Sequence, residues 1–151
     1  MRFFHQLKAL ILGSIFVLSA CSTSSLDRAQ NVVQNTPSYE DMYLRGVFNW
    51  WEANEQFKLV ESSNNVYSAT LELIADGQPY DFKIADSSWT ASLNCGAFEL
   101  KLLTLDESIN LVCQENSLNL QFQPKQTGKF VFTLDASDPF YPELRISKAV
   151  N

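Results

Sequence analysis

From residue 42 onward, apolar and polar side chains alternate over a series of short runs. Residues 66–73 (VYSATLEL), 80–85 (YDFKIA) and 129–135 (KFVFTLD) place an apolar residue at every second position. This period of two is that of a β-strand with one face on the core and the other in water. The pattern therefore predicts β-strands in these three runs.

Further strand-like runs are bounded by Asn, Gly, Asp, Ser or Pro, and they lie at residues 42–51, 56–61, 98–105, 109–113, 118–122 and 143–147. The pairs Asn64–Asn65 and Asp76–Gly77 are turn signals, and each separates two such runs. Many short strands with close turns predict an all-β fold, an immunoglobulin-like antiparallel β-sandwich. The segment 97–105 (AFELKLLTL) alone leaves a short helix open as an alternative.

The start of the chain has the pattern of an export signal. Arg2 and Lys8 precede an apolar segment at residues 9–20, which is too short to span a bilayer comfortably. The segment ends in Leu-Ser-Ala followed by Cys21, which matches the bacterial lipobox. We expect residues 1–20 to be a lipoprotein signal peptide and Cys21 to carry the lipid. The alternative is an ordinary secretory cleavage site beside an incidental cysteine.

A lipidated Cys21 would anchor the mature protein to a membrane. Each buried methylene of the acyl chains contributes about 0.8 kcal/mol, so several chains, such as palmitate, hold durably. Ser22 stands where an aspartate would mark a lipoprotein for retention in the inner membrane. We therefore expect an outer-membrane lipoprotein, on either the periplasmic or the surface face of that membrane. Residues 21–41 are polar and predict a flexible linker, and residues 42–151 are long enough for one domain.

The charge of the mature chain excludes several classes of function. Cleavage after residue 20 removes Arg2, Lys8 and the only histidine, His5, which leaves nine basic against 17 acidic side chains, a net charge of −8. Such a surface disfavours nucleic acid as a partner. Without histidine, the chain lacks the commonest general base and metal ligand. We expect no enzyme activity, no cofactor and no metal site.

Cys95 and Cys113 are the two cysteines that remain in the predicted domain. In an oxidising compartment such a pair forms a disulfide readily, which we expect here. The alternative, two buried free thiols, is unusual outside the cytoplasm.

Two residues stand out near the centre of the domain. In the run 80–85, Lys83 falls on the polar face, so the alternation predicts that it points to solvent. Trp89 follows in a polar loop with no obvious core to enter.

These residues belong to a longer pattern, which resembles the β-sandwich starch- and glycogen-binding modules appended to bacterial pullulanases and amylases. The resemblance covers most of residues 42–147. The motifs that carry it are Leu44-Arg45-Gly46, Asn49-x-Trp51, Tyr67 at the start of a long strand, Phe82-Lys83-Ile84-Ala85, and Trp89.

The resemblance implies an α-glucan site made of Tyr67, Lys83 and Trp89. Pyranose faces stack on aromatic rings, and sugar hydroxyls accept hydrogen bonds from a long cationic donor. Tyr67 is equally placed to cap the end of the sandwich. Trp51 matches a family tryptophan for which core packing competes with ligand contact. Trp50 stands where the family often has a small residue, so it either adds a stacking surface or partly covers the cleft.

The function that follows is non-catalytic binding of starch, glycogen or maltooligosaccharides by a membrane-anchored lipoprotein. The alternative is a protein-interaction lipoprotein that docks a secreted amylase or pullulanase, or an envelope complex. In that case Trp50 and Trp51 would be interface anchors, because tryptophan is enriched at binding hot spots.

Overall fold

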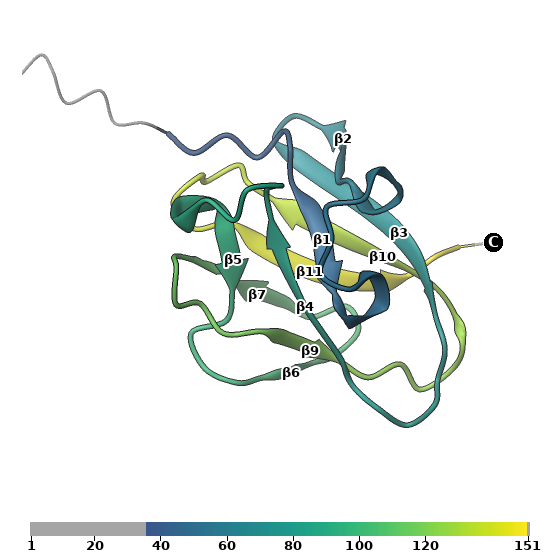
Figure 1. Cartoon of the computed structure of the whole chain (residues 1–151). Helices are drawn as coiled ribbons and strands as arrows, with labels where there is room; N and C mark the ends of the chain where they lie inside the picture. The colour runs from purple at the N-terminus through teal and green to yellow at the C-terminus, as the bar shows by residue number, and fades with distance from the viewer. Residues whose placement is uncertain (1–35, 151) are drawn as a thin grey trace, which may run out of the picture. The chain divides into compact units, whose positions relative to one another are not determined.

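Two β-sheets pack against each other in the computed structural model of the chain, which describes residues 36–150 (Figure 1). The first sheet has six strands in the order β6-β9-β4-β5-β8, with β1 paired to β4. Its strands are β1 (Tyr43–Gly46), β4 (Tyr80–Ala85), β5 (Asn94–Gly96), β6 (Leu102–Leu103), β8 (Val112–Cys113) and β9 (Leu120–Phe122).

The second sheet has five strands in the order β2-β3-β10-β11-β7. They are β2 (Val60–Ser63), β3 (Val66–Leu73), β7 (Ser108–Asn110), β10 (Gly128–Asp135) and β11 (Glu143–Lys148). The remaining elements are the short 3-10 turns η1 (Val47–Asn49), η2 (Glu55–Phe57) and η3 (Ala91–Leu93). The predicted all-β sandwich is confirmed. Among the strand pairs of the described residues, β6–β9 is parallel and the others are antiparallel.

Strand β4 is the centre of the first sheet. Its whole second half pairs with β1 on one edge, in the register Gly46 opposite Phe82 and Tyr43 opposite Ala85. On the other edge it pairs with β9 at its start and with β5 at its end. The pairing of β4 with β1 positions the turns that follow these two strands.

The core lies where the apolar faces of the two sheets meet. Phe82 and Ile84 of β4 are fully buried, as are Phe132 and Leu134 of β10. The rings of Phe82 and Phe132 meet edge to face, with centroids 5.3 Å apart. Edge-to-face contact is a favoured arrangement of aromatic pairs. The period-two alternation thus identified the buried faces of these strands correctly.

One of the two predicted turns lies within a sheet, and the other connects the two sheets. Asn64–Asn65 closes the β2–β3 hairpin, and Asn65 adopts the left-handed backbone that such a turn requires (φ 58°). The segment that contains Asp76 and Gly77 instead carries the chain from β3 in the second sheet to β4 in the first, with Gly77 at φ 85°. Residues 97–105 contain β6 and no helix, so the helical alternative for this segment is wrong.

The packed domain begins before the predicted boundary at residue 42. Tyr39, in the segment predicted to be linker, is buried, and its hydroxyl donates a hydrogen bond to the carbonyl of Pro139 (2.8 Å). The predicted signal peptide, Cys21 and the rest of the predicted linker up to residue 35 lie outside the described residues. Within residues 36–150, no helix is long and apolar enough to cross a membrane.

The predicted disulfide is confirmed. Cys95 of β5 lies directly opposite Cys113 of β8, and their sulfur atoms are bonded. The bond joins two of the shortest strands of the first sheet, which have few ladder hydrogen bonds to hold them together. A covalent link across a loop of this size restricts the unfolded chain.

We predict that the double substitution Cys95→Ala with Cys113→Ala lowers the free energy of unfolding by about 3 kcal/mol, because the two cysteines lie 18 positions apart in the sequence. Urea unfolding followed by circular dichroism measures the change. Dithiothreitol should shift the parent curve towards that of the variant and leave the variant curve in place. Superimposable parent and variant curves would contradict the prediction.

Candidate functional site

A tight turn at residues 46–52 follows β1 and carries two tryptophans. The side chain of Asn49 organises it: its Oδ1 accepts from the Gly46 amide (2.8 Å), and its Nδ2 donates to the carbonyls of Leu44 (2.9 Å) and Glu52 (3.1 Å). The Trp51 amide donates back to the Gly46 carbonyl (2.9 Å). A Cβ at Gly46 would lie 2.6 Å from the carbonyl oxygen of Asp81, so only glycine permits this close approach to β4.

A second turn, at residues 86–90, follows β4 and carries Trp89. The carboxylate of Asp86 closes it by accepting from the Thr90 amide (2.8 Å) and the Thr90 hydroxyl (2.6 Å). Such local side-chain bonds to the backbone are typical of Asp in turns. Each of the two turns is therefore held by its own polar side chain.

Arg45 of β1 joins the two turns. Its Nε donates to the carbonyl of Trp51 (2.7 Å), and its Nη1 donates to the carbonyls of Asp86 (2.7 Å) and Ser87 (3.2 Å). The centre of its guanidinium lies 3.8 Å from the centroid of the Trp89 ring. Arg45 is buried, and this burial lowers its pKa, a shift that the nearby Asp86 carboxylate opposes.

The result is an aromatic surface on the outer side of the first sheet. The rings of Trp51 and Trp89 lie 6.4 Å apart between centroids and are inclined by 41°. Trp51 is half-buried, Trp89 is 37% exposed, and Trp50 beside them is 87% exposed. The ring of Trp50 is thus exposed, and its role as a stacking surface or as a partial cover of the cleft stays a prediction.

All three tryptophans have a left-handed backbone, with φ of 55° at Trp50, 64° at Trp51 and 57° at Trp89. This conformation is rare for bulky residues and is found where the surrounding structure enforces it, often at functional sites. Chemically, two inclined indole faces and a third exposed ring offer flat apolar platforms, which suit the C–H faces of sugar rings.

Lys83 does not contribute to this surface, and the prediction that it points to solvent is wrong. It is only 8% exposed. Its ammonium group donates to Asn94 Oδ1 (3.1 Å), Ser117 Oγ (2.9 Å) and the Ser117 carbonyl. Its three donors are therefore engaged inside the protein. Burial lowers the pKa of Lys83.

Tyr67 also lies away from the tryptophans, and the structure does not bring the three predicted residues together. It belongs to β3 in the second sheet, opposite Leu134 of β10, whereas Lys83 belongs to the first sheet. Tyr67 is 6% exposed, and burial, followed by the nearby Glu61 and Glu40, raises the pKa of its hydroxyl. Its place in the core fits the alternative role of capping one end of the sandwich.

The sequence interpretation assigned no role to Arg45, Asn49 or Asp86. Arg45 and Asn49 lie within the motifs that carry the resemblance, but arginine on a strand and asparagine before tryptophan are too common to identify their function. The signal for Asp86 was its spacing of four residues from Thr90, which fits a side-chain cap across a short loop.

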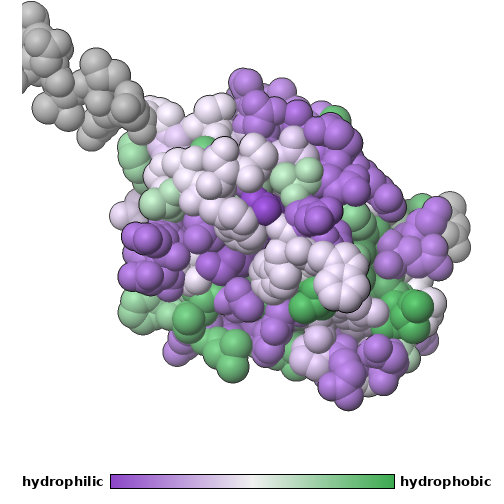
Figure 2. Space-filling view, viewed as in Figure 1, coloured by the Kyte–Doolittle hydropathy of each residue, from purple (hydrophilic) through white to green (hydrophobic). Residues whose placement is uncertain are grey.

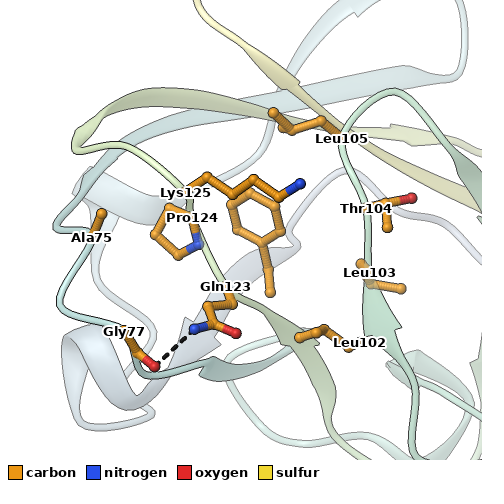
Figure 3. Close-up of a pocket in the computed structure, with 10 residues that line it drawn as sticks. Ala75, Gly77, Leu102, Leu103, Thr104, Leu105, Gln123, Pro124 and Lys125 are labelled. Atoms are coloured by element: carbon orange, nitrogen blue, oxygen red, sulfur yellow. Dashed lines mark hydrogen bonds between the residues drawn. The ribbon is translucent and has the colours of Figure 1, made fainter.

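A cavity of about 670 Å³ opens near the other end of β4. Figure 3 shows Pro124 and Lys125 on one side of it and the segment Leu102–Leu105 on the other, and Gln123 Nε2 donates to the Gly77 carbonyl (2.7 Å) at its edge. The part of the chain that leads into the segment Leu102–Leu105 carries exposed apolar side chains at Phe98, Leu100 and Leu102. Figure 2 shows hydrophobic surface at the lower left, over the connection from β5 to β6.

The segment at 135–142 is a turn. Asp135 accepts from the Ser137 amide (2.9 Å), and Asp138 accepts from the Phe140 amide (3.0 Å). The hydrogen bonds to Ser137 lower the pKa of Asp135. Among residues 36–150, no group of three or more His, Cys, Asp or Glu side chains is arranged to hold a metal ion.

No protein-family model matches the chain, and no curated protein matches it. Among solved structures, the chain is similar to the ligand-induced structure of AmyP-SBD, a starch-binding domain, with a TM-score of 0.56 and 19% sequence identity. The alignment covers 95% of this chain and 99% of that chain. At this identity the similarity shows a shared β-sandwich fold.

We predict that Lys83→Met lowers the free energy of unfolding by about 2–4 kcal/mol, because Asn94 Oδ1 and the Ser117 carbonyl lose their buried donor. The control is Lys125→Met, which removes an exposed lysine and should change stability little. Urea unfolding of the three proteins measures the difference. A Lys83→Met variant as stable as the parent would show that the buried ammonium is not structural.

Proposed function

We propose that the domain is a non-catalytic module that binds α-glucans such as starch, glycogen or maltooligosaccharides. The observation that carries the proposal is the inclined pair of Trp51 and Trp89, with an exposed Trp50 next to Trp51 in the chain. A curved α-1,4-glucan chain turns its successive rings, so it fits two inclined platforms better than the flat ribbon of cellulose does. The similarity in fold to a starch-binding domain supports the same class of ligand.

The binding residues in this proposal differ from the predicted set. Trp89, Trp51 and Trp50 provide the stacking surface, whereas Tyr67 and Lys83 are buried elsewhere. Stacking with few hydrogen bonds gives modest affinity, so we expect a Kd between about 1 mM and 1 μM, or roughly −4 to −8 kcal/mol. The role of such a module is capture, which raises the local concentration of polymer near secreted hydrolases or uptake channels.

We predict that maltoheptaose changes the tryptophan fluorescence of the parent in a saturable way and that cellohexaose does not. Trp89→Ala should abolish this response and the retention on a starch column, because it removes one of the two platforms. Its thermal melt should stay cooperative and fall only modestly, since Trp89 is partly exposed and lies in a surface turn, although its ring covers the Arg45 guanidinium.

The matched control for Trp89→Ala is Phe98→Ala, which removes an aromatic ring that is 82% exposed but lies outside the site. It should bind maltoheptaose like the parent. Equal retention of Trp89→Ala and the parent on starch would refute the proposed site.

We further propose that a lipid on Cys21 holds the domain on the outer membrane. The lipobox at residues 18–21 supports this placement. Cys21→Ser in the full-length chain should prevent incorporation of labelled palmitate and move the protein from the membrane fraction to the soluble fraction. An unchanged distribution would contradict lipid anchoring.

The second candidate function is docking of a secreted hydrolase or an envelope complex. The observation that favours it is the exposed apolar segment with Phe98, Leu100 and Leu102 beside the cavity, because such patches mark interaction surfaces. A pull-down from envelope extracts with and without excess maltoheptaose separates the two functions. Partners that persist in sugar and disappear with Phe98→Ala would favour docking.

A further inference from the structure

We propose that Arg45 is a positioning residue that holds the two tryptophan-bearing turns at a fixed separation, so that the sugar-binding surface exists before ligand arrives. The inference rests on the proposed function, since it concerns the same surface. It adds a residue that acts through Trp51 and Trp89 rather than on the ligand.

The contacts of Arg45 reach both turns at once. One edge of its guanidinium binds the backbone of the first turn at Trp51, and the other binds the backbone of the second turn at Asp86 and Ser87. Among the hydrogen bonds that the structure gives for residues 36–150, only those of Arg45 join residues 46–52 to residues 86–90. Beyond the β1–β4 pairing and the Trp51–Trp89 ring contact, the relative position of the turns therefore depends on this side chain.

The guanidinium also fixes the orientation of one ring. It lies over one face of Trp89, with 3.8 Å between its central carbon and the ring centroid. Arginine stacks well on indole because its cationic plane meets the electron-rich ring face. This contact occupies one face of the Trp89 ring, and 37% of the residue's surface stays exposed.

The burial of Arg45 indicates a geometric role. It is 7% exposed, and within residues 36–150 no carboxylate forms an ion pair with it, so its charge is compensated by main-chain carbonyls, the Trp89 ring and the nearby Asp86 carboxylate. Burying such a group is costly unless its donors are satisfied. An apolar side chain would avoid this cost, but it would leave the backbones of the two turns without a hydrogen-bonded link.

Lysine cannot replace arginine in this role. Its ammonium is a compact group on a flexible stem, whereas the planar fork of arginine donates in several fixed directions while it stacks. We therefore expect Arg45→Lys to keep the charge and lose the coupling between the turns.

The test uses two readouts on Arg45→Lys and Arg45→Met. The first is the exciton couplet of the Trp51–Trp89 pair in the far-ultraviolet circular dichroism spectrum, which reports the mutual orientation of the rings without any ligand. Trp51→Phe assigns this couplet. The second is the Kd for maltoheptaose from tryptophan fluorescence. We expect both variants to lose most of the couplet and to bind about tenfold more weakly or worse, because preorganisation is lost.

Arg145→Lys is the matched control, because Arg145 is exposed on β11 and pairs with Asp106 (3.6 Å) away from the tryptophans. It should keep the parent couplet and Kd. Variants of Arg45 that keep both would overturn the inference. A weaker Kd with an intact couplet would also overturn it, because Arg45 would then act as a direct ligand contact.

Failure of the proposed function is distinguishable from failure of this inference. A parent that does not bind maltoheptaose refutes the function, while the couplet still shows whether Arg45 orients the rings. Should both Arg45 variants fail to fold, proton NMR of the parent decides. We expect a slowly exchanging Arg45 Nε–H signal, shifted by the Trp89 ring and moved by Trp89→Phe. Rapid exchange without such a shift would overturn the inference.

Discussion

The antiparallel pairing of β1 with β4 is the constraint from which the candidate site follows. Because antiparallel strands end at opposite ends of their pairing, the turns that follow Gly46 and Ala85 begin about 10 Å apart, three residues along the pair. Both turns fold over the outer side of the sheet. Arg45 lies between them and is long enough to reach each, so the register of one strand pair determines which side chain can connect the turns.

The same pairing places Arg45 directly opposite Lys83. Two like charges in this relation destabilise a sheet unless other groups compensate. Here a different part of the chain buries each cation: the two tryptophan turns lie over Arg45, and the segment at Ser117 lies over Lys83. Carbonyl, hydroxyl and amide oxygens take the place of carboxylates. The two tryptophan turns and the segment at Ser117 thus cover this part of the outer face of the sheet. The turns are hydrogen-bonded to Arg45, and the segment at Ser117 is hydrogen-bonded to Lys83.

The fold was predictable from the sequence because its signals are local. Alternation identified the strands and the faces of Phe82 and Phe132 that form the core, and the two cysteines of the domain identified the disulfide. The site was predictable only in part. Alternation correctly placed Lys83 on the opposite side of β4 from Phe82, but it does not show that a segment more than thirty residues later covers that side. Likewise, nothing local shows that the chain changes sheets between Tyr67 and Lys83.

The left-handed backbone of the three tryptophans is strained. Each such residue costs roughly 1–3 kcal/mol relative to an ordinary conformation, and glycine would relieve the strain. Selection for thermal stability alone would therefore favour glycine at residue 50, whose ring is 87% exposed, whereas the partial burial of the Trp51 and Trp89 rings and the contact of Trp89 with Arg45 offset the strain at the other two residues. A chain that retains the indole of Trp50 is kept below its attainable stability, and the preservation of this ring in descendants would report continued selection for what it contacts.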